Sequence, residues 1–189
     1  MLHYVVERLR AAPADEIRVV TRPEKRDIVE EANALGLSIV AATPETLALS
    51  VYAGIDGLAD DDVVLLGFPD SVWDPVDGFR QLLTVLEDGT AVVLGLFRSD
   101  EPQRGDVVQL RGDVAGVHVK SPDPPGDLIW GIAAAGAGTL RRLRDYREPG
   151  HLFDELARAG LVRSVRFPGE FIDIGTKEAL ERARALLGK

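Results

Sequence analysis

The chain has 189 residues, of which 46% are hydrophobic, and this is enough apolar material for one sizeable core. Its net charge of -9 argues against a sequence-independent grip on nucleic acid, which needs a basic face along the phosphates. The absence of cysteine excludes disulfides, zinc–thiolate sites and thiol nucleophiles. We therefore expect one domain, residues 1–189, that handles small molecules and has no nucleic-acid partner.

The chain shows no segment that would place it in or across a membrane. No apolar run approaches the roughly 20 residues that a spanning helix needs. The N-terminal sequence MLHYVVERLR is interrupted by charged residues before the apolar core of a signal peptide could form. We expect a cytoplasmic protein with no membrane partner.

The first third of the chain predicts alternating helices and strands. An amphipathic helix over 2–10 precedes a short buried strand over 16–21, a helix over 23–36 closed by Gly36, and a strand over 37–42. Thr43 followed by Pro44 predicts the N-cap and first position of the next helix, which runs through LALSVYAGI. This alternation is typical of an α/β fold.

The central part of the chain predicts a buried strand and then a change in pattern. VVLLG (63–67) reads as a strand buried on both faces, and Asp74-Pro75 predicts the cap of a helix whose apolar stripe begins at Phe79. After TAVVLGLF, the segments DVVQL, VAGVHVK and LIWGIAA are separated by short turns, which favours antiparallel or mixed pairing.

The last third predicts two helices, two strands and a final helix. The helices lie around 139–146 and 151–159, the strands are VRSVRF and EFIDI, and Thr176 is the expected N-cap of the last helix. The whole pattern predicts a three-layer α/β/α, Rossmann-like domain with a mixed, mainly parallel sheet.

Two aspartates stand at the ends of predicted strands. Asp70 follows VVLLG, where Pro69 stiffens the backbone, and Asp173 ends the strand in FIDIGTKEAL. Ligands collect at the carboxyl ends of strands in open α/β sheets, and Mg²⁺ takes one or two protein carboxylates. The two aspartates therefore predict a shared Mg²⁺ site; the alternative is that Asp70 only stabilises a turn.

Four segments carry a resemblance to a known family. GFPDSVWDP, VHVKSP, LIWGIA and FIDIGTKEAL resemble, in the same order, blocks of the sugar-1-phosphate nucleotidyltransferases, particularly the glucose-1-phosphate thymidylyltransferase-like branch. The resemblance implies the nucleotide-diphospho-sugar transferase fold. It also implies a reaction in which a sugar 1-phosphate attacks a nucleoside triphosphate, with dTTP or UTP favoured, to give a nucleotide-sugar and pyrophosphate.

The resemblance also implies roles for individual residues. Asp70 and Asp173 match the metal-binding, catalytic aspartates, and Lys120 matches the catalytic lysine that binds the sugar phosphate, although Val119 and Ser121 depart from the acidic residue and proline that flank it in the family. Gly131 matches a glycine that faces the sugar. Thr46 matches a residue near the base, in an element whose glycine is missing from this sequence.

One block of the family is absent from residues 1–30. It is a first strand that leads into a GGxGTRL loop, which cradles the triphosphate. Two explanations stay open: the chain is an N-terminally incomplete copy of an enzyme, or a shortened homologue with a binding role. In either case, a sheet without that strand would leave unpaired backbone groups and a slot, which we expect to lower stability or to be filled by formation of a homo-oligomer.

Other interpretations remain open at this stage. The first alternative function is a non-catalytic nucleotide-sugar or sugar-phosphate binding homologue, and the second is a glycosyltransferase, which would be expected to show an Asp-x-Asp pair that Asp70-Ser71-Val72 does not supply. Lys120 could equally be a solvated lysine, and Trp130 is expected to be a core aromatic. The three histidines lie in separate elements without ligand spacing, and we interpret them as structural or solvated.

Overall fold

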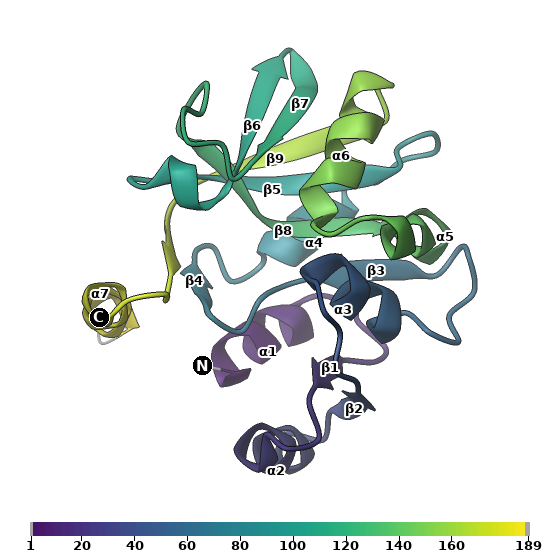
Figure 1. Cartoon of the computed structure of the whole chain (residues 1–189), viewed down its shortest axis with the longest axis vertical. Helices are drawn as coiled ribbons and strands as arrows, with labels where there is room; N and C mark the ends of the chain where they lie inside the picture. Colours follow the sequence, from purple (N-terminus) through teal and green to yellow (C-terminus); the bar gives the residue numbers. More distant parts are fainter. Residues whose placement is uncertain (1, 188–189) are drawn as a thin grey trace.

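A computed structural model describes residues 2–187 of the chain, and its elements run as follows (Figure 1). The helices are α1 (Leu2–Ala11), α2 (Arg26–Ala34), α3 (Leu47–Gly54), α4 (Gly78–Leu83), α5 (Ala137–Leu140), α6 (Pro149–Arg158) and α7 (Lys177–Leu187), with 3-10 turns η1 (Pro102–Arg104) and η2 (Arg141–Asp145). The strands are β1 (Arg18–Thr21), β2 (Ser38–Ala41), β3 (Val63–Leu66), β4 (Ser71–Trp73), β5 (Val92–Arg98), β6 (Asp106–Arg111), β7 (Asp113–Val119), β8 (Leu128–Gly136) and β9 (Val162–Asp173).

The strands form a large mixed sheet and a small separate one. The large sheet has seven strands in the order β4-β9-β5-β8-β6-β7, and β3 pairs with β8 at the side of this path. Strands β5 and β9 pair in parallel, as do β1 and β2 in the small sheet, whereas β3–β8, β4–β9, β5–β8, β6–β7 and β6–β8 are antiparallel. The α/β class and the mixed sheet expected from the sequence are confirmed, and the antiparallel middle portion is found where short turns replace helices.

The core lies on both faces of the central strand β5. Val92, Leu94 and Leu96 belong to one apolar cluster with residues of α3, α5 and α6, while Val93 and Phe97 belong to a second cluster with residues of α4. Successive side chains of a strand point to opposite faces, so helices cover the sheet on both sides. This arrangement gives the three layers that the sequence predicts.

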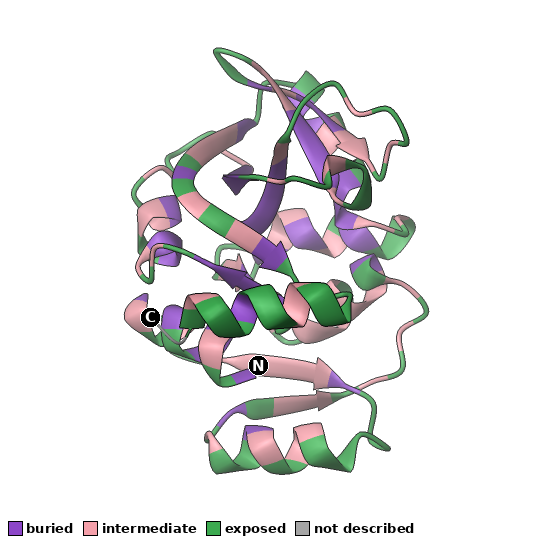
Figure 2. Cartoon of the chain, turned by 90° about the vertical axis from the view of Figure 1, so that its left-hand side faces the viewer, coloured by how far each residue is buried: buried purple, intermediate pink, exposed green. Residues whose placement is uncertain are grey.

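The N-terminal helix packs as its apolar spacing predicts. Leu2, Val5 and Val6 are buried against Ala32 of α2 and Leu37, while the opposite side of the helix carries exposed residues. Figure 2 shows the same contrast in α2, which turns its exposed side to solvent beneath the small sheet. Among the described residues, none of the helices combines the length and apolar character needed to cross a bilayer.

Two of the expected helix caps are wrong. Thr46, and not Thr43, caps α3: it has the extended backbone of an N-cap residue, and its hydroxyl accepts a hydrogen bond from the Leu49 N–H at 3.2 Å. Asp74 does not cap α4, because its carboxylate lies 3.3 Å from an Arg8 guanidinium nitrogen and the helix begins after Asp77. The expected Thr176 cap is confirmed by a bond from the Ala179 N–H at 3.1 Å.

Two strands that the sequence predicts separately form one continuous strand, and the structure contains one further strand that the sequence does not predict. Residues 162–173 form the continuous strand β9, which pairs with β5 in its first part and with β4 in its last. A register shift between Leu96 and Arg98 of β5 lies opposite the segment around Pro168, which separates the two strands expected from sequence. Strand β4 has only three residues, and it is buried because it pairs with the distant end of β9.

Candidate functional site

A cavity of about 330 Å³ lies where several strands of the large sheet end. It takes residues from the β3–β4 connection, the first residue of β6, the residue after β7, the first half of β8 and the end of β9. Its charged lining residues are Asp70, Asp100, Glu101, Arg104, Asp106, Lys120, Glu148, Asp173 and Arg182. Three of the predicted site residues are therefore in this lining, together with Gly131.

Asp70 and Asp173 are neighbours although 103 positions of the chain separate their numbers. Ser71, directly after Asp70, is the register partner of Asp173 in the antiparallel pair of β4 and β9. The N–H of Ile174, directly after Asp173, donates to the Asp70 carbonyl oxygen at 2.8 Å. Short strand β4 thus fixes the two aspartates side by side at the mouth of one cavity, and both side chains are largely exposed.

The negative charge of Asp70 affects the ionisation of Asp173. Partial burial raises the pKa of the Asp173 carboxyl, the nearby negative charge of Asp70 raises it further, and Arg104 partly opposes the shift. Two carboxylates whose charges repel each other at a cavity are the arrangement that a bound cation would relieve.

Lys120 sits directly after β7 with an unusual backbone. Its φ of 41° lies in the left-handed region, which a residue with a Cβ seldom adopts. Its N–H donates to Asp106 Oδ1 at 3.3 Å, and its ammonium donates to Glu148 Oε1 at 2.8 Å. Two carboxylates therefore hold the backbone and the side chain of Lys120 over the cavity.

Asp106 connects Lys120 to the central strand β8. Its second oxygen, Oδ2, accepts a hydrogen bond from the Trp130 indole N–H at 3.1 Å, and the side chain is buried. Burial raises the pKa of Asp106, and the bonds from Trp130 and the Lys120 backbone partly oppose that rise. Trp130 is a core aromatic, as expected, and it also has a polar partner in the wall of the cavity.

Gly131 and Thr46 differ in their relation to the cavity. Gly131 lines it, but a Cβ on this residue would lie 2.2 Å from the Phe171 ring, so the absence of a side chain is required by packing within the wall. Thr46 caps α3, and it is the following residue, Leu47, that reaches the cavity lining. The structure thus brings together Asp70, Asp173, Lys120 and Gly131, and leaves Thr46 one residue away.

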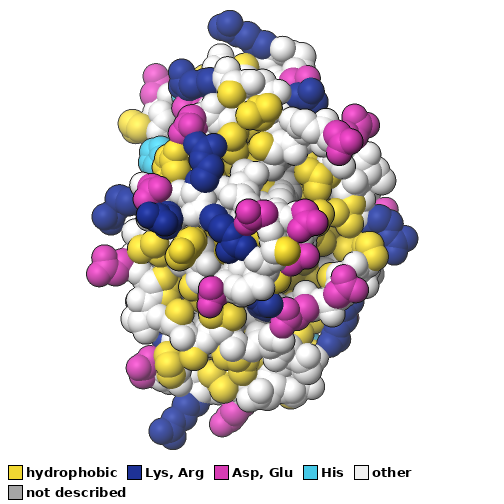
Figure 3. Space-filling model, turned by 90° about the vertical axis from the view of Figure 1, so that its right-hand side faces the viewer, with side chains coloured by type: hydrophobic (Ala, Val, Ile, Leu, Met, Phe, Trp, Pro, Cys, Tyr) yellow, Lys and Arg dark blue, Asp and Glu magenta, His cyan; other side chains and the backbone are white. Residues whose placement is uncertain are grey.

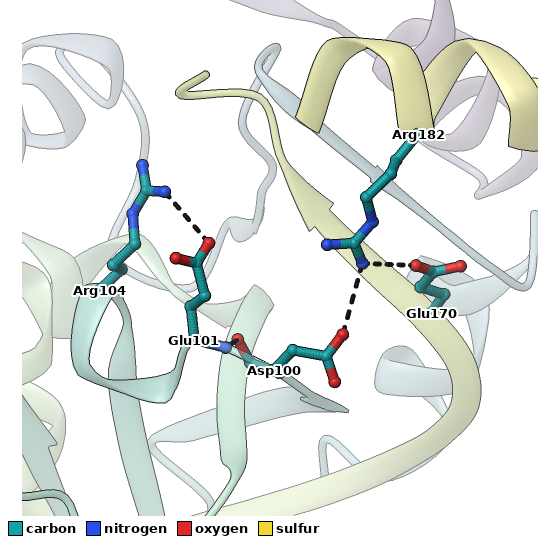
Figure 4. A network of polar contacts seen from close by, with 6 residues as sticks. Asp100, Glu101, Arg104, Glu170 and Arg182 are labelled. Atoms are coloured by element: carbon teal, nitrogen blue, oxygen red, sulfur yellow. Dashed lines mark hydrogen bonds and ion pairs between the residues drawn. The ribbon is translucent and has the colours of Figure 1, made fainter. Parts of the chain in front are cut away.

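Two arginines bring positive charge to the same cavity (Figure 4). Arg104 pairs with Glu101 at 3.2 Å, and Arg182 of α7 pairs with Glu170 at 2.6 Å and with Asp100 at 3.6 Å. These pairs are solvent-exposed, so each contributes little to stability and each arginine can exchange its partner at small cost. They are available to a phosphate group that enters the cavity.

The lining as a whole has more negative than positive groups. Six carboxylates and three cationic side chains line the cavity, so an anionic ligand would meet net repulsion unless a cation accompanied it. Within residues 2–187 no group of three or more His, Cys, Asp or Glu residues has the spacing of a metal site. A cation at Asp70 and Asp173 would therefore have two protein carboxylates, which fits the hard-oxygen chemistry of Mg²⁺ and its retained waters.

One face of the molecule carries a charge distribution that is mixed rather than basic. Figure 3 shows one face on which acidic and basic side chains are interspersed with apolar patches. Such a face lacks the continuous positive stripe that follows a phosphate backbone.

Comparison with solved structures shows the fold. The chain superposes, with a TM-score of 0.84 and 17% identity, on a structure described as a glucose-1-phosphate thymidylyltransferase from Bacillus anthracis in complex with sucrose, covering 98% of this chain and 81% of that one. It also superposes on a UDP-glucose pyrophosphorylase complexed with UDP-glucose, with a TM-score of 0.77, 15% identity and coverage of 98% and 85%. The chain has the fold of the sugar-1-phosphate nucleotidyltransferases. No family model matches its sequence, and no curated protein matches it at a significant level.

Six charged residues of this cavity were not identified from sequence: Asp100, Glu101, Arg104, Asp106, Glu148 and Arg182. Asp106 is the first residue of β6, Glu148 directly precedes α6, and Arg104 is the last residue of η1. The available signals were Asp106 at the head of the apolar run VVQL, and Glu148 directly before Pro149 at the first position of α6. Neither signal indicates on its own that the side chain meets Lys120.

Proposed function

We propose that this protein transfers a nucleotidyl group from a nucleoside triphosphate to a sugar 1-phosphate, releasing pyrophosphate. A phosphate oxygen of the sugar 1-phosphate would attack the α-phosphorus, and the bond from that phosphorus to the oxygen bridging to the β-phosphate would break. The attacking phosphate is already anionic near neutral pH, so the reaction needs no general base. Positioning and neutralisation of charge supply most of the catalysis in such reactions.

The proposed divalent cation is Mg²⁺, held by Asp70 and Asp173. When bound, Mg²⁺ supplies positive charge to the phosphate oxygens and orients them. The observation that supports it is the pair of adjacent carboxylates, one with a raised pKa, at the mouth of a cavity with an excess of negative charge.

The protein's own cations would act on the phosphates. Lys120 is held above the cavity by Asp106 and Glu148, and its ammonium would steady the attacking sugar phosphate as a point charge. Arg104 and Arg182 would meet the remaining phosphate oxygens after exchanging their exposed carboxylate partners. Gly131 would lie beside the sugar, and Thr46 near the base through its neighbour Leu47.

The proposal also includes the identity of the nucleotide base and of the sugar. The two solved structures are described as a thymidylyltransferase and a UDP-glucose pyrophosphorylase. Together with the sequence resemblance, they favour dTTP or UTP as the triphosphate and a hexose 1-phosphate as the acceptor. A cytoplasmic location, where both substrates occur, remains the expectation from the sequence.

The test measures Mg²⁺-dependent binding and turnover of the full chain. Pyrophosphate release is followed with the four ribonucleoside triphosphates and dTTP, each with a panel of sugar 1-phosphates, and triphosphate binding is followed in parallel by calorimetry. We expect pyrophosphate release and triphosphate binding to depend on Mg²⁺. Asp70→Ala and Asp173→Ala should each lower them by about 100-fold, since both remove a charge from the reacting region. Asp113→Ala, an exposed aspartate at the β6–β7 turn, is the matched control.

Each outcome decides between the functions. Turnover that is insensitive to Asp70→Ala and Asp173→Ala contradicts the proposed site. Mg²⁺-dependent binding without pyrophosphate release favours the non-catalytic binding homologue, and a folded chain with neither signal rejects both.

A further inference from the structure

Strand β4 lies at the edge of the large sheet, with helix α1 beside it (Figure 1). Within residues 2–187, β4 pairs with β9 alone, and the Ile174 N–H donates to the Asp70 carbonyl across this pair. The backbone groups of an antiparallel strand point alternately to its two sides, so those of Trp73, three residues after Asp70, point away from β9. Trp73 is fully buried, and its outward N–H and C=O therefore need partners other than bulk water.

Two side chains of α1 serve both backbone groups of Trp73. The Tyr4 hydroxyl accepts a hydrogen bond from the Trp73 N–H at 3.0 Å and donates one to the Trp73 carbonyl. Arg8 Nε donates to the same carbonyl at 3.0 Å. Tyr4 and Arg8, which we call the α1 clamp, thus close the outer edge of β4 with side chains.

Arg8 is buried although it carries a charge. Its guanidinium lies 3.3 Å from the Asp74 carboxylate, and its Cζ lies 3.4 Å from the centroid of the Tyr4 ring. A buried guanidinium is costly unless its charge and its donors are matched, and the carboxylate, the Trp73 carbonyl and the ring face match them here. The buried charge of Arg8 is therefore committed to the end of β4.

The backbone of β4 connects the clamp to the two aspartates. Ser71, two residues before Trp73, is the register partner of Asp173, and Asp70 directly precedes Ser71. Because β4 has only three residues, few backbone bonds hold it to β9. Movement of Trp73 would therefore move Ser71 and disturb the alignment of Asp70 with Asp173.

Packed aromatic rings form a second connection. The Trp73 and Phe97 ring centroids are 5.7 Å apart, and those of Phe97 and Phe171 are 5.1 Å apart. Phe171 lines the candidate site and packs closely on Gly131. Because protein interiors are close-packed, a shift of the Trp73 ring would be passed on to this wall of the cavity.

We propose that Tyr4 and Arg8 are positioning residues of the candidate site: by holding Trp73 they keep β4 against β9, and so keep Asp70 and Asp173 at the spacing that a shared cation requires. Neither side chain belongs to the cavity lining, so both act through β4. The alignment of the aspartates is a property of the fold, whereas its consequence for Mg²⁺ rests on the proposed function. The competing explanation is that the clamp only adds to the overall stability of the domain.

The first measurement is hydrogen–deuterium exchange of single amides in the full chain, under conditions in which exchange reports local opening. Tyr4→Phe removes the hydroxyl and keeps the ring against Arg8. We expect it to speed exchange at Trp73 and Ile174 by about tenfold relative to Leu94 of the central strand β5. Tyr52→Phe, at an exposed position of α3, is the matched control and should change none of these amides.

Variants of Arg8 test the second half of the clamp. Arg8→Met keeps an apolar stem and removes the guanidinium, so it should speed exchange at Trp73 and Ile174 as well. Arg8→Lys keeps a positive charge near Asp74 and should retain more of the protection. Arg10→Met is the control on the same helix, because Arg10 is exposed and donates to the Leu35 carbonyl instead. Should Arg8→Met fail to fold, Tyr4→Phe and Arg8→Lys decide the question.

The second measurement is the affinity of the folded chain for Mg²⁺, followed by the carboxyl ¹³C resonances of Asp70 and Asp173. Tyr4→Phe should raise the dissociation constant by about tenfold, and Tyr52→Phe should leave it unchanged. A clamp that only stabilised the domain would not change this constant, because the affinity of a fully folded population does not depend on its margin of stability.

Several results would overturn the proposal. They are unchanged exchange in Tyr4→Phe, equal acceleration at Trp73, Ile174 and Leu94, or faster exchange at Ile174 with unchanged affinity for Mg²⁺. An unmodified chain that binds no Mg²⁺ would reject the proposed cation site. The exchange of Ile174, which needs neither Mg²⁺ nor turnover, would then decide alone whether the clamp aligns the two aspartates.

Discussion

Asp70 and Asp173 are held side by side by the three-residue strand β4, since Ser71 pairs in register with Asp173 and the Ile174 N–H bonds to the Asp70 carbonyl. Asp173 is the last residue of β9 and Asp70 lies in the turn directly before β4, so the β4–β9 pairing begins one residue after Asp70. Backbone pairing next to both residues restrains their relative positions. This relationship underlies the proposed cation site.

Replacing Asp70 should change the ionisation of Asp173. Burial and the charge of Asp70 both raise the pKa of Asp173, so Asp70→Asn should lower that pKa while the contribution of burial remains. The measurement is a carboxyl ¹³C NMR titration of the full chain, with Asp88→Asn as a control of equal charge change. A pKa of Asp173 that does not move in Asp70→Asn would show that the two side chains do not interact.

The same shift predicts a pH dependence of stability. Because the pKa of Asp173 is higher in the folded chain than in the unfolded one, the folded state holds this proton more tightly. Its contribution to stability is fully present below the unfolded-state pKa and is lost as the pH rises through the folded-state pKa. Asp173→Asn should remove this part of the pH dependence, as measured by urea unfolding across that range; an unchanged profile would contradict the shift.

Asp106 should be needed as an acceptor in the wall of the site. Asp106→Asn keeps an oxygen for the Trp130 indole N–H, whereas Asp106→Ala leaves that buried donor unpaired. We expect the alanine variant to be about 1–3 kcal/mol less stable than the asparagine variant. Comparing these two variants removes the effect of losing the charge, and urea unfolding measures the difference. Equal stability of the two would mean that water or another group serves the indole equally well.

Gly131 should be intolerant of a side chain for reasons of packing. A Cβ at this position would lie 2.2 Å from the Phe171 ring, so Gly131→Ala should cost about 1–3 kcal/mol through displacement of that ring. Gly126→Ala is the matched control, because its Cβ would meet no atom within 4 Å. Thermal unfolding of both variants measures the difference, and a Gly131→Ala variant as stable as the control would contradict the close contact.

The elements that could be predicted from sequence are those fixed by local patterns. The apolar spacing of α1, the glycine that ends α2 with a φ of 68°, and the Thr176 cap all depend on neighbouring residues. Strand β4 and the continuity of β9 could not be predicted, because both depend on pairing between segments about 100 residues apart. The misplaced cap at Thr43 has the same origin: several cap-forming residues precede α3, and tertiary packing selects Thr46.

The candidate site likewise combines residues that local sequence patterns indicate with contacts that only the fold creates. Strand-end aspartates were recognisable because Asp70 and Asp173 each follow an apolar run. The hydrogen bonds of Asp106 to Trp130 and to the Lys120 backbone have no sequence pattern, since they join three strands of the sheet at positions that only the fold brings together.

The most direct test of the account is the binding of Mg²⁺ at the two aspartates. Mg²⁺ is titrated into the full chain while the carboxyl ¹³C resonances of Asp70 and Asp173 are followed. We expect both resonances to shift along one saturation curve, and Asp70→Asn to weaken the response of Asp173 at least tenfold. Resonances that ignore Mg²⁺, or that saturate independently of each other, would contradict a shared cation.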